Sequence, residues 1–315
     1  MRRIAAAVVA ATIVTALGII APPAQAMAPQ DQPLGNKCAV FPADNIWNTR
    51  IDGLPVNGQS ATWMASMDAG TTNLHPDFGR SPYGMPITFV KSGHHLHSIR
   101  FSYAGQSDRV GYPFSATTNI EQGSDRHALM VNTDNCTLYE LFDAHWDHGH
   151  PWAGSGAVFH LGSDALRPAG WTSADAAGLP IVPGLVRWGE VESGSIDHAI
   201  RFTAECTSQE YLWPARHEAG SSDASCPPMG ARFRLKSSFD ISSFSPDAQV
   251  ILRAMQQYGL ILADNGSNWY FQGTENPHWT DALLDQLKSI PASEFEAVDE
   301  SGCQVSANSG QAACP

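Results

Sequence analysis

The sequence has few positive charges, and it contains no long apolar run after residue 21. It has 18 Lys and Arg residues against 31 Asp and Glu residues, for a formal net charge of −13. Because phosphate backbones repel so acidic a chain, we expect no nucleic-acid partner. The lack of a second apolar run predicts that the body of the chain has no membrane-spanning helix.

Motifs of several enzyme classes are also missing. There is no GxSxG, which excludes the nucleophile elbow of an α/β-hydrolase. No P-loop, GxGxxG, EF-hand loop or HExxH occurs, which removes the usual nucleotide, calcium and zinc-protease signatures. No CxxC occurs either, so neither a zinc ribbon nor a thioredoxin-type site is expected. The motifs in the chain therefore do not identify the reaction that the protein would catalyse.

The first 26 residues are typical of a secretory signal peptide. Arg2 and Arg3 precede an apolar and small-residue run from Ile4 to Ala21, and the residues AQA (24–26) form a small-x-small cleavage signal. We therefore predict a secreted, extracellular protein that has no membrane attachment after cleavage and is monomeric. The predicted segments are a signal peptide (1–26), a short leader (27–37), a single β-rich catalytic domain (38–299) and a disulfide-closed polar tail (300–315).

Cysteine usage supports export. An even count of six cysteines in an exported chain indicates three disulfides rather than thiolate metal ligands. One pair brackets a Gly/Ser-rich segment and another closes the polar tail, so the remaining two cysteines would staple the mature N-terminus onto the body. The predicted pairs are Cys206 with Cys226, Cys303 with Cys314, and Cys38 with Cys136.

Most of the body consists of short strand-like segments separated by Gly, Pro, Asn and Asp. Several alternate apolar with polar residues, as half-buried strands do. The sequence Asn265-Gly266 between two apolar runs predicts a hairpin, because a type I′ turn requires positive φ at both central positions. The predicted strands are 86–90, 98–103, 127–131, 138–142, 157–161, 199–203 and 231–235, with the hairpin joining 260–264 to 269–272.

Helices are predicted at three places only. Ser245 as N-cap, Pro246 at the first helical position and Gly259 after the end frame one of them. The others are 280–289 and 60–68. Many short strands with few helices predict a mainly β fold, a β-sandwich or jelly-roll with peripheral helices and three disulfide staples.

Several long segments resemble an uncharacterised family of secreted bacterial proteins. The resemblance covers most of the chain from Cys38 to about Asp299, and it implies no reaction because no activity is attached to that family. The histidine-rich HWDHGH (145–150) and the doublet His94–His95 lie outside it. The segments that carry it are PADNIWNTRID (42–52), LHPDFG (74–79), LRPAGWTSADAAGLPIVPGLVRW (166–188), DHAIRFT (197–203), WPARH (213–217) and FSPDAQVILRAMQQYGLILADNGS (244–267).

An exported, strand-rich chain with nine tryptophans favours an enzyme that acts on an extracellular polysaccharide. Indole faces stack on sugar rings, although they also fill cores. Four tryptophans lie in Gly/Pro/Asn-rich surroundings and are the candidate sugar platforms: Trp152, Trp171, Trp269 and Trp279.

A glycosidase needs two carboxyl groups across the scissile bond. Glu140 is a candidate, whereas Asp143, three residues further along a strand, points to the other face. The second carboxyl would then be Asp77, Asp197 or Asp264.

A polysaccharide lyase instead needs cations for the uronate carboxylate and a His or Tyr as base. His127 or His198 would be that base, and Arg201 or Arg216 the cation. Structural ion pairs would leave the same pattern in the sequence. The full catalytic candidate set is His75, Asp77, Arg126, His127, Glu140, Asp197, His198, Arg201, Arg216 and His217.

Histidine clusters leave open a metal site. His95 and His97 share a strand face, and imidazole suits zinc and copper. A second cluster comprises His145, His148 and His150. We expect no required cofactor and favour a glycoside hydrolase, with a polysaccharide lyase next. Two further classes stay open: a non-catalytic glycan or cell-wall binding protein, and an enzyme with a His-ligated divalent metal.

Overall fold

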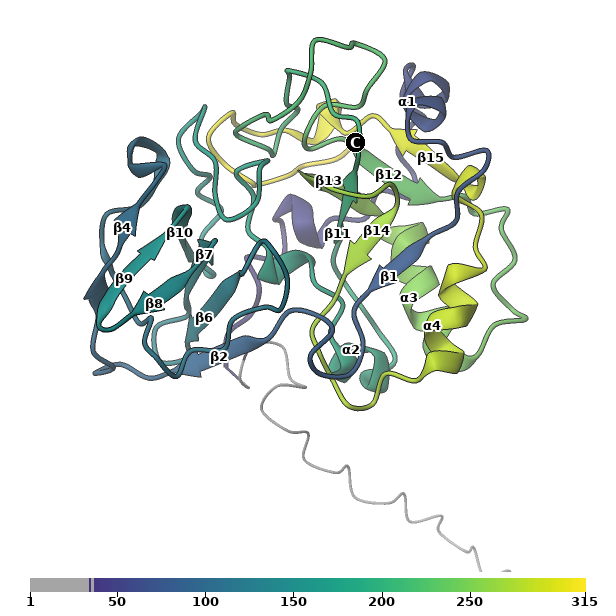
Figure 1. Ribbon diagram of the computed structural model, residues 1–315. Helices are drawn as coiled ribbons and strands as arrows, with labels where there is room; N and C mark the ends of the chain where they lie inside the picture. The colour runs from purple at the N-terminus through teal and green to yellow at the C-terminus, as the bar shows by residue number, and fades with distance from the viewer. Residues whose placement is uncertain (1–33, 35–36) are drawn as a thin grey trace, which may run out of the picture.

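The computed structural model of the chain describes Leu34 and residues 37–315. The predicted signal peptide and most of the predicted leader lie outside these residues. The described chain is mainly strands with a few peripheral helices, arranged as two principal sheets that share one core (Figure 1). The predicted mainly β, sandwich-like, disulfide-stapled fold is therefore confirmed.

The larger sheet has six strands in the order β1-β14-β11-β13-β12-β15. Its central strand β11 (Ile200–Ala204) is buried along its whole length, runs parallel to β13 (Leu260–Asn265) and runs antiparallel to β14 (Tyr270–Gln272). Helix α3 (Pro246–Gln257) packs on β12, and α4 (Asp281–Lys288) packs on β1. The edge strands are β1 (His75–Asp77) and β15 (Phe295–Val298), and β12 (Arg232–Leu235) lies between β13 and β15.

The smaller sheet has four strands in the order β10-β7-β6-β2. Side chains of β6 alternate between two cores. Leu129 and Val131 join the main core that the larger sheet also faces, whereas Ala128 and Met130 join a second core with Phe114. The sheet is thus buried on both faces. Its strands are β2 (Ile87–Val90), β6 (Ala128–Asn132), β7 (Thr137–Phe142) and β10 (Ser155–His160).

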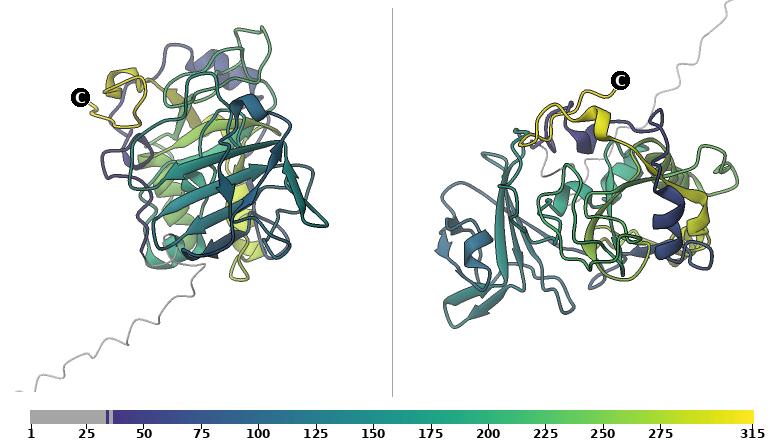
Figure 2. Two further views of the ribbon diagram at one scale, coloured as in Figure 1. Left: turned by 90° about the vertical axis from the view of Figure 1, so that its left-hand side faces the viewer. Right: turned by 90° about the horizontal axis from the view of Figure 1, so that it is seen from above.

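Two small sheets cover the outer side of the four-stranded sheet (Figure 2). They comprise β3 (His97–Ser98) with β5 (Gly111–Tyr112), and β4 (Arg100–Phe101) with β9 (His150–Ala153) and β8 (His145–Asp147). The remaining helices are α1 (Ser60–Ser66) and α2 (Trp188–Ser193). None of the helices in the described residues combines the length and apolar character needed to cross a bilayer.

The predicted secondary structure covers most of these elements, but it misses the strands β1, β5, β8, β9 and β15. Each predicted strand overlaps an observed one, although 98–103 is divided between β3 and β4. The predicted N-cap is confirmed, because the Ser245 side chain accepts a hydrogen bond from the backbone N–H of Ala248.

The hairpin predicted at Asn265-Gly266 is wrong. Strands β13 and β14 do not pair with each other, because β11 lies between them. The connection passes over the end of β11 instead. The Gly266 N–H donates to the Ala204 carbonyl (3.0 Å), and the Thr203 hydroxyl donates to the Ser267 carbonyl (2.8 Å). The chain does turn between the two strands, but a third strand takes the place of the local partner.

All three predicted disulfides are present: Cys38–Cys136, Cys206–Cys226 and Cys303–Cys314. No free cysteine occurs among the described residues. Three disulfides and no free thiol are consistent with an extracellular protein.

Candidate functional site

A pocket of about 240 Å³ opens where the two principal sheets meet. Phe142 at the end of β7 and Ser155 at the start of β10 come from the smaller sheet, and Asp264 comes from β13 of the larger one. Three loops complete the wall, contributing Tyr103 and Gln106, the run 172–176, and His217 with Ala219.

A buried ion pair forms the floor of this pocket. Arg201 on β11 donates from Nε to Asp175 Oδ2 (2.9 Å), and its Nη2 donates to Oδ1. Both residues are at most 2 % exposed. Burial alone would lower the pKa of Arg201, but the Asp175 carboxylate raises it. The pair therefore stays ionised in the core, with the planar guanidinium matched to both carboxylate oxygens.

A tight loop places Asp175 on this floor. The Asp175 N–H donates to Ser173 Oγ (2.9 Å), and the Gly178 N–H donates back to the Asp175 carbonyl (3.2 Å). Gly178 has φ +70°, and a Cβ there would lie 2.4 Å from the Trp171 carbonyl oxygen. Only glycine fits this position, so the loop conformation depends on it.

Asp264 lies above the ion pair and is partly exposed in the pocket wall. Burial and the Asp175 charge raise the pKa of Asp264 well above its usual range, and the nearby Arg201 offsets only part of this. With its pKa raised to about 8, Asp264 holds a proton at neutral pH. The pocket therefore contains a carboxylic acid able to donate a proton.

His127 lies beneath the same loop as a cation. Its Nδ1 contacts Glu121 Oε2 (2.5 Å) and its Nε2 contacts the Ala174 carbonyl oxygen (3.2 Å). Both partners are acceptors, so both ring nitrogens carry protons. Burial lowers the pKa of His127, but Glu121 more than compensates and raises it to about 9. His127 therefore cannot serve as a base at neutral pH, contrary to the role expected of it in a lyase.

Glu140 is fully buried and has a structural role. Both carboxylate oxygens accept from the Ile181 N–H (3.0 and 2.9 Å), and Oε1 also accepts from the Val182 N–H (2.9 Å). Burial raises the pKa of Glu140 to about 7, although these backbone hydrogen bonds oppose the shift. Glu140 does not line the pocket, so it is not placed to protonate a ligand there.

His217 faces the pocket with one nitrogen available. Its Nδ1 donates to the Ala176 carbonyl (2.9 Å), and no described residue forms a hydrogen bond with Nε2. A neutral imidazole that donates from Nδ1 presents an acceptor at Nε2. His217 is therefore the group in this pocket that is arranged to take a proton.

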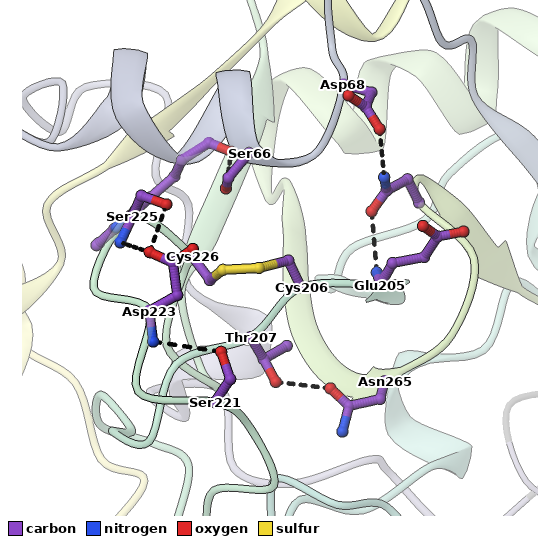
Figure 3. Close-up of a disulfide and its surroundings, with 12 residues drawn as sticks. Ser66, Asp68, Glu205, Cys206, Thr207, Ser221, Asp223, Ser225, Cys226 and Asn265 are labelled. Atoms are coloured by element: carbon purple, nitrogen blue, oxygen red, sulfur yellow. Dashed lines mark hydrogen bonds between the residues drawn. A yellow bond between two sulfur atoms is a disulfide. The ribbon is translucent and has the colours of Figure 1, made fainter.

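The loop that carries His217 is fastened next to Asp264. Cys206–Cys226 closes its base, and the Asn265 side chain accepts from Thr207 Oγ1 (2.6 Å) (Figure 3). The Asn265 side chain also donates to the Ala219 carbonyl (2.8 Å). These contacts hold the two functional side chains on one rigid wall. Asp223 lies close to both cysteines, but their sulfurs are bonded to each other and provide no thiolate for a metal.

Four other predicted catalytic residues lie away from the pocket. His75 stacks on Tyr270 at the edge of the larger sheet, and Asp77 accepts from the Tyr83 hydroxyl (2.6 Å). Arg126 donates to the Ala144 carbonyl, and Asp197 accepts from the Ser195 hydroxyl. None of the four lines the pocket.

Two further candidates have structural partners. His198 donates from Nδ1 to the Ala199 carbonyl, and its Nε2 lies 3.1 Å from Arg187 Nη2, in a separate hollow of about 910 Å³. Arg216 donates to the carbonyls of Arg167 and Ala307 and to the side chain of Asn308. It ties the C-terminal tail to the body and does not line the pocket.

Two of the four tryptophans predicted as sugar platforms are buried, and the role of the other two stays a prediction. Trp269 and Trp279 are fully buried and belong to the main core, so neither presents a face to a ligand. Trp152 stacks on His145 with ring centroids 4.0 Å apart, and Trp171 lies against the Arg167 guanidinium. These two are partly exposed, but neither lines the pocket.

The predicted histidine clusters are only loosely assembled. The rings of His95 and His97 meet edge to face, 4.4 Å between centroids. His145 and His148 contact Asp143 and Asp147 respectively, while His150 is exposed. In the part of the chain that the structure describes, no three of these side chains converge on one point closely enough to hold a metal.

The ion pair around His127 predicts how stability depends on pH. The imidazole keeps its proton up to about pH 9 when folded, against a normal pKa of 6.5. We expect the free energy of unfolding to fall by on the order of 3 kcal/mol between these two values, because the unfolded chain releases the proton first. Urea unfolding of the wild type and of His127→Gln across this range measures it. A variant with an undiminished pH dependence would show that another group is responsible.

Sequence reasoning missed Asp175. It lies in the small-residue loop SADAA (173–177), where an acidic side chain is normally expected to be exposed to solvent. No sequence motif relates its position to that of Arg201. The signal that existed was indirect: a buried arginine in a strand needs a carboxylate partner. No family model, curated protein or solved structure matches this chain.

Proposed function

We propose that this protein is a secreted enzyme that hydrolyses glycosidic bonds of an extracellular polysaccharide at the pocket between the two principal sheets. The observation that carries the proposal is the arrangement of Asp264 and His217. One is a protonated carboxyl and the other a histidine with a free acceptor nitrogen, and both face the same pocket. Glycoside hydrolysis requires such an acid and such a base.

The proposed reaction uses both groups in one displacement. Asp264 transfers its proton to the leaving glycosidic oxygen as the bond from the anomeric carbon to that oxygen breaks. His217 Nε2 accepts a proton from a water whose oxygen forms the new bond to the anomeric carbon. Asp175, fixed by Arg201, keeps the proton on Asp264 before reaction. Proton exchange with solvent afterwards restores both groups.

Charge favours a hydrolase over a lyase. No Lys or Arg lines the pocket, whereas a lyase requires a cation against the uronate carboxylate. The two arginines predicted for that role are occupied, Arg201 by Asp175 and Arg216 by the C-terminal tail. His127, the predicted base, already carries two protons.

A binding module and a metal enzyme have less support. A glycan-binding module would present a flat row of exposed tryptophans, and all nine tryptophans, which lie in the described part of the chain, are buried or only partly exposed. A His-ligated metal enzyme would need three converging protein ligands, and none of the predicted histidines belongs to such a group among the described residues. We further propose that the chain belongs to the secreted bacterial family it resembles, because Asp175, Arg201, His217 and Asp264 all fall within the segments that carry the resemblance.

Incubation of the purified protein with plant, algal and bacterial-wall polysaccharides tests the proposal. We expect new reducing ends without the ultraviolet absorbance of unsaturated uronates, and no loss of activity with a chelator. Unsaturated products would indicate a lyase, and chelator-sensitive activity would point to the histidine clusters. Retention on one polymer with no product from any would leave a binding protein.

A further inference from the structure

We infer that this pocket accepts a single uncharged sugar unit at the end of a glycan chain and rejects acidic units. The inference rests on the proposed function, and it adds the class of substrate and the position of the cut. Two independent observations carry it: the small volume of the pocket, and the lack of a Lys or Arg side chain among its lining residues.

The pocket is too small for an extended chain. At about 240 Å³ it lies below the roughly 300–1,000 Å³ usual for drug-sized ligands, so it has room for about one sugar ring. Walls rise from both sheets and from three separate loops, with Tyr103 and Phe142 as aromatic surfaces for a ring face. A polymer would therefore enter by its end, and one unit would be released in each turnover.

The charges around the pocket are unfavourable to an anion. No Lys or Arg lines the pocket, and the two cations next to it, Arg201 and His127, are each already paired with a carboxylate. An acidic sugar would have to place its carboxylate next to Asp264 with no cation to receive it. Such a buried, unpaired charge is strongly disfavoured. Hydroxyl groups of an uncharged ring instead match the polar atoms of Gln106, Thr172 and His217.

The test compares matched substrates that differ only in the acid group. The 4-nitrophenyl glycosides of glucose, galactose, mannose and xylose would be assayed beside the glucuronide and galacturonide, and products from uncharged oligosaccharides would be separated by size. We expect kcat/KM for the best uncharged glycoside to exceed that of the matching uronide by a factor of about one hundred, and monosaccharide to be the sole early product.

A designed change in charge sharpens the test. Ala219 is exposed and lines the pocket, so a longer side chain there fits without disturbing the core. Ala219→Arg should raise the ratio of uronide to uncharged kcat/KM by about tenfold, the effect of one charge-assisted contact. Ala219→Gln, similar in reach and uncharged, should not raise the ratio.

The possible outcomes distinguish a failure of this inference from a failure of the proposed hydrolase function. Equal cleavage of uronides, or products of intermediate length from the start, would overturn the substrate class and the chain-end position while leaving a hydrolase. An unchanged ratio in Ala219→Arg would overturn the role assigned to charge. If no glycoside or oligosaccharide is cleaved by the correctly folded protein, the proposed function fails and the inference fails with it.

Discussion

Arg201→Met is expected to lower the free energy of unfolding by about 3–5 kcal/mol, the cost of leaving a buried charge without its partner. Arg201 and Asp175 are both almost fully buried, and two hydrogen bonds join them. Methionine retains much of the side-chain volume but provides no donor, so the Asp175 carboxylate would have to bind a proton in the core. Urea unfolding monitored by tryptophan fluorescence measures the change.

Two further variants distinguish the loss of the ion pair from a general disruption of packing. In Arg201→Met with Asp175→Leu, both charges are absent, and we expect most of the lost stability to return because no uncompensated charge remains. Arg126→Met removes an arginine with one backbone hydrogen bond at a partly exposed position, and it should cost at most about 1 kcal/mol. If the double variant is no more stable than Arg201→Met, packing rather than charge dominates this site.

Asp264→Asn should reduce turnover by about 10²–10⁴-fold, because the amide fills the same space but cannot transfer a proton. The folded state should not suffer. Asp264 is already uncharged at neutral pH, so the neutral asparagine amide adds no charge next to Asp175 and requires no raised pKa. We therefore expect a thermal unfolding midpoint equal to or above that of the wild type, measured beside the initial rate on the best substrate.

Asp197→Asn provides the matched control. Asp197 is also a catalytic candidate from the sequence, but it is exposed, bonds to Ser195 and lies outside the pocket. Its replacement should leave the rate within about twofold, since substitutions at such surface positions rarely have larger effects. Comparable rates for Asp264→Asn and the wild type would place the active site elsewhere. A large loss in Asp197→Asn would point instead to the hollow that contains His198.

Local patterns are sufficient to predict the disulfides and all but five of the strands, the short β1, β5, β8, β9 and β15. Alternation of apolar and polar residues depends on neighbours in the chain, and the Ser245 cap with Pro246 is a local arrangement as well. The cysteine pairs follow from segment composition in an exported chain. The hairpin prediction fails because pairing between strands is not local: β11, more than fifty residues upstream, lies between the two runs.

The candidate site shows the same difference between what local sequence predicts and what depends on distant partners. His127, Glu140, Arg201 and His217 are all candidates from the sequence, and the structure brings them together around one loop. Their roles cannot be predicted from the sequence, because a role depends on partners from other sheets. Glu140 is expected to be an acid, yet backbone N–H groups of residues 181 and 182 occupy both of its oxygens. Asp175 is missed because its importance comes entirely from Arg201.

The order of strands in the larger sheet has a consequence for how the chain folds. Both strands that pair with β11, namely β13 and β14, come later in the chain than β11 itself. Strand β1 likewise pairs with β14, which lies nearly two hundred residues further along. Strands β6, β7 and β10 of the smaller sheet lie within residues 128–160 and pair antiparallel, so they can associate without waiting for distant sequence. Distant pairings form slowly because a long loop must close before any contact is gained. We therefore expect the smaller sheet to form before the larger one, and the pocket between the two sheets to form last.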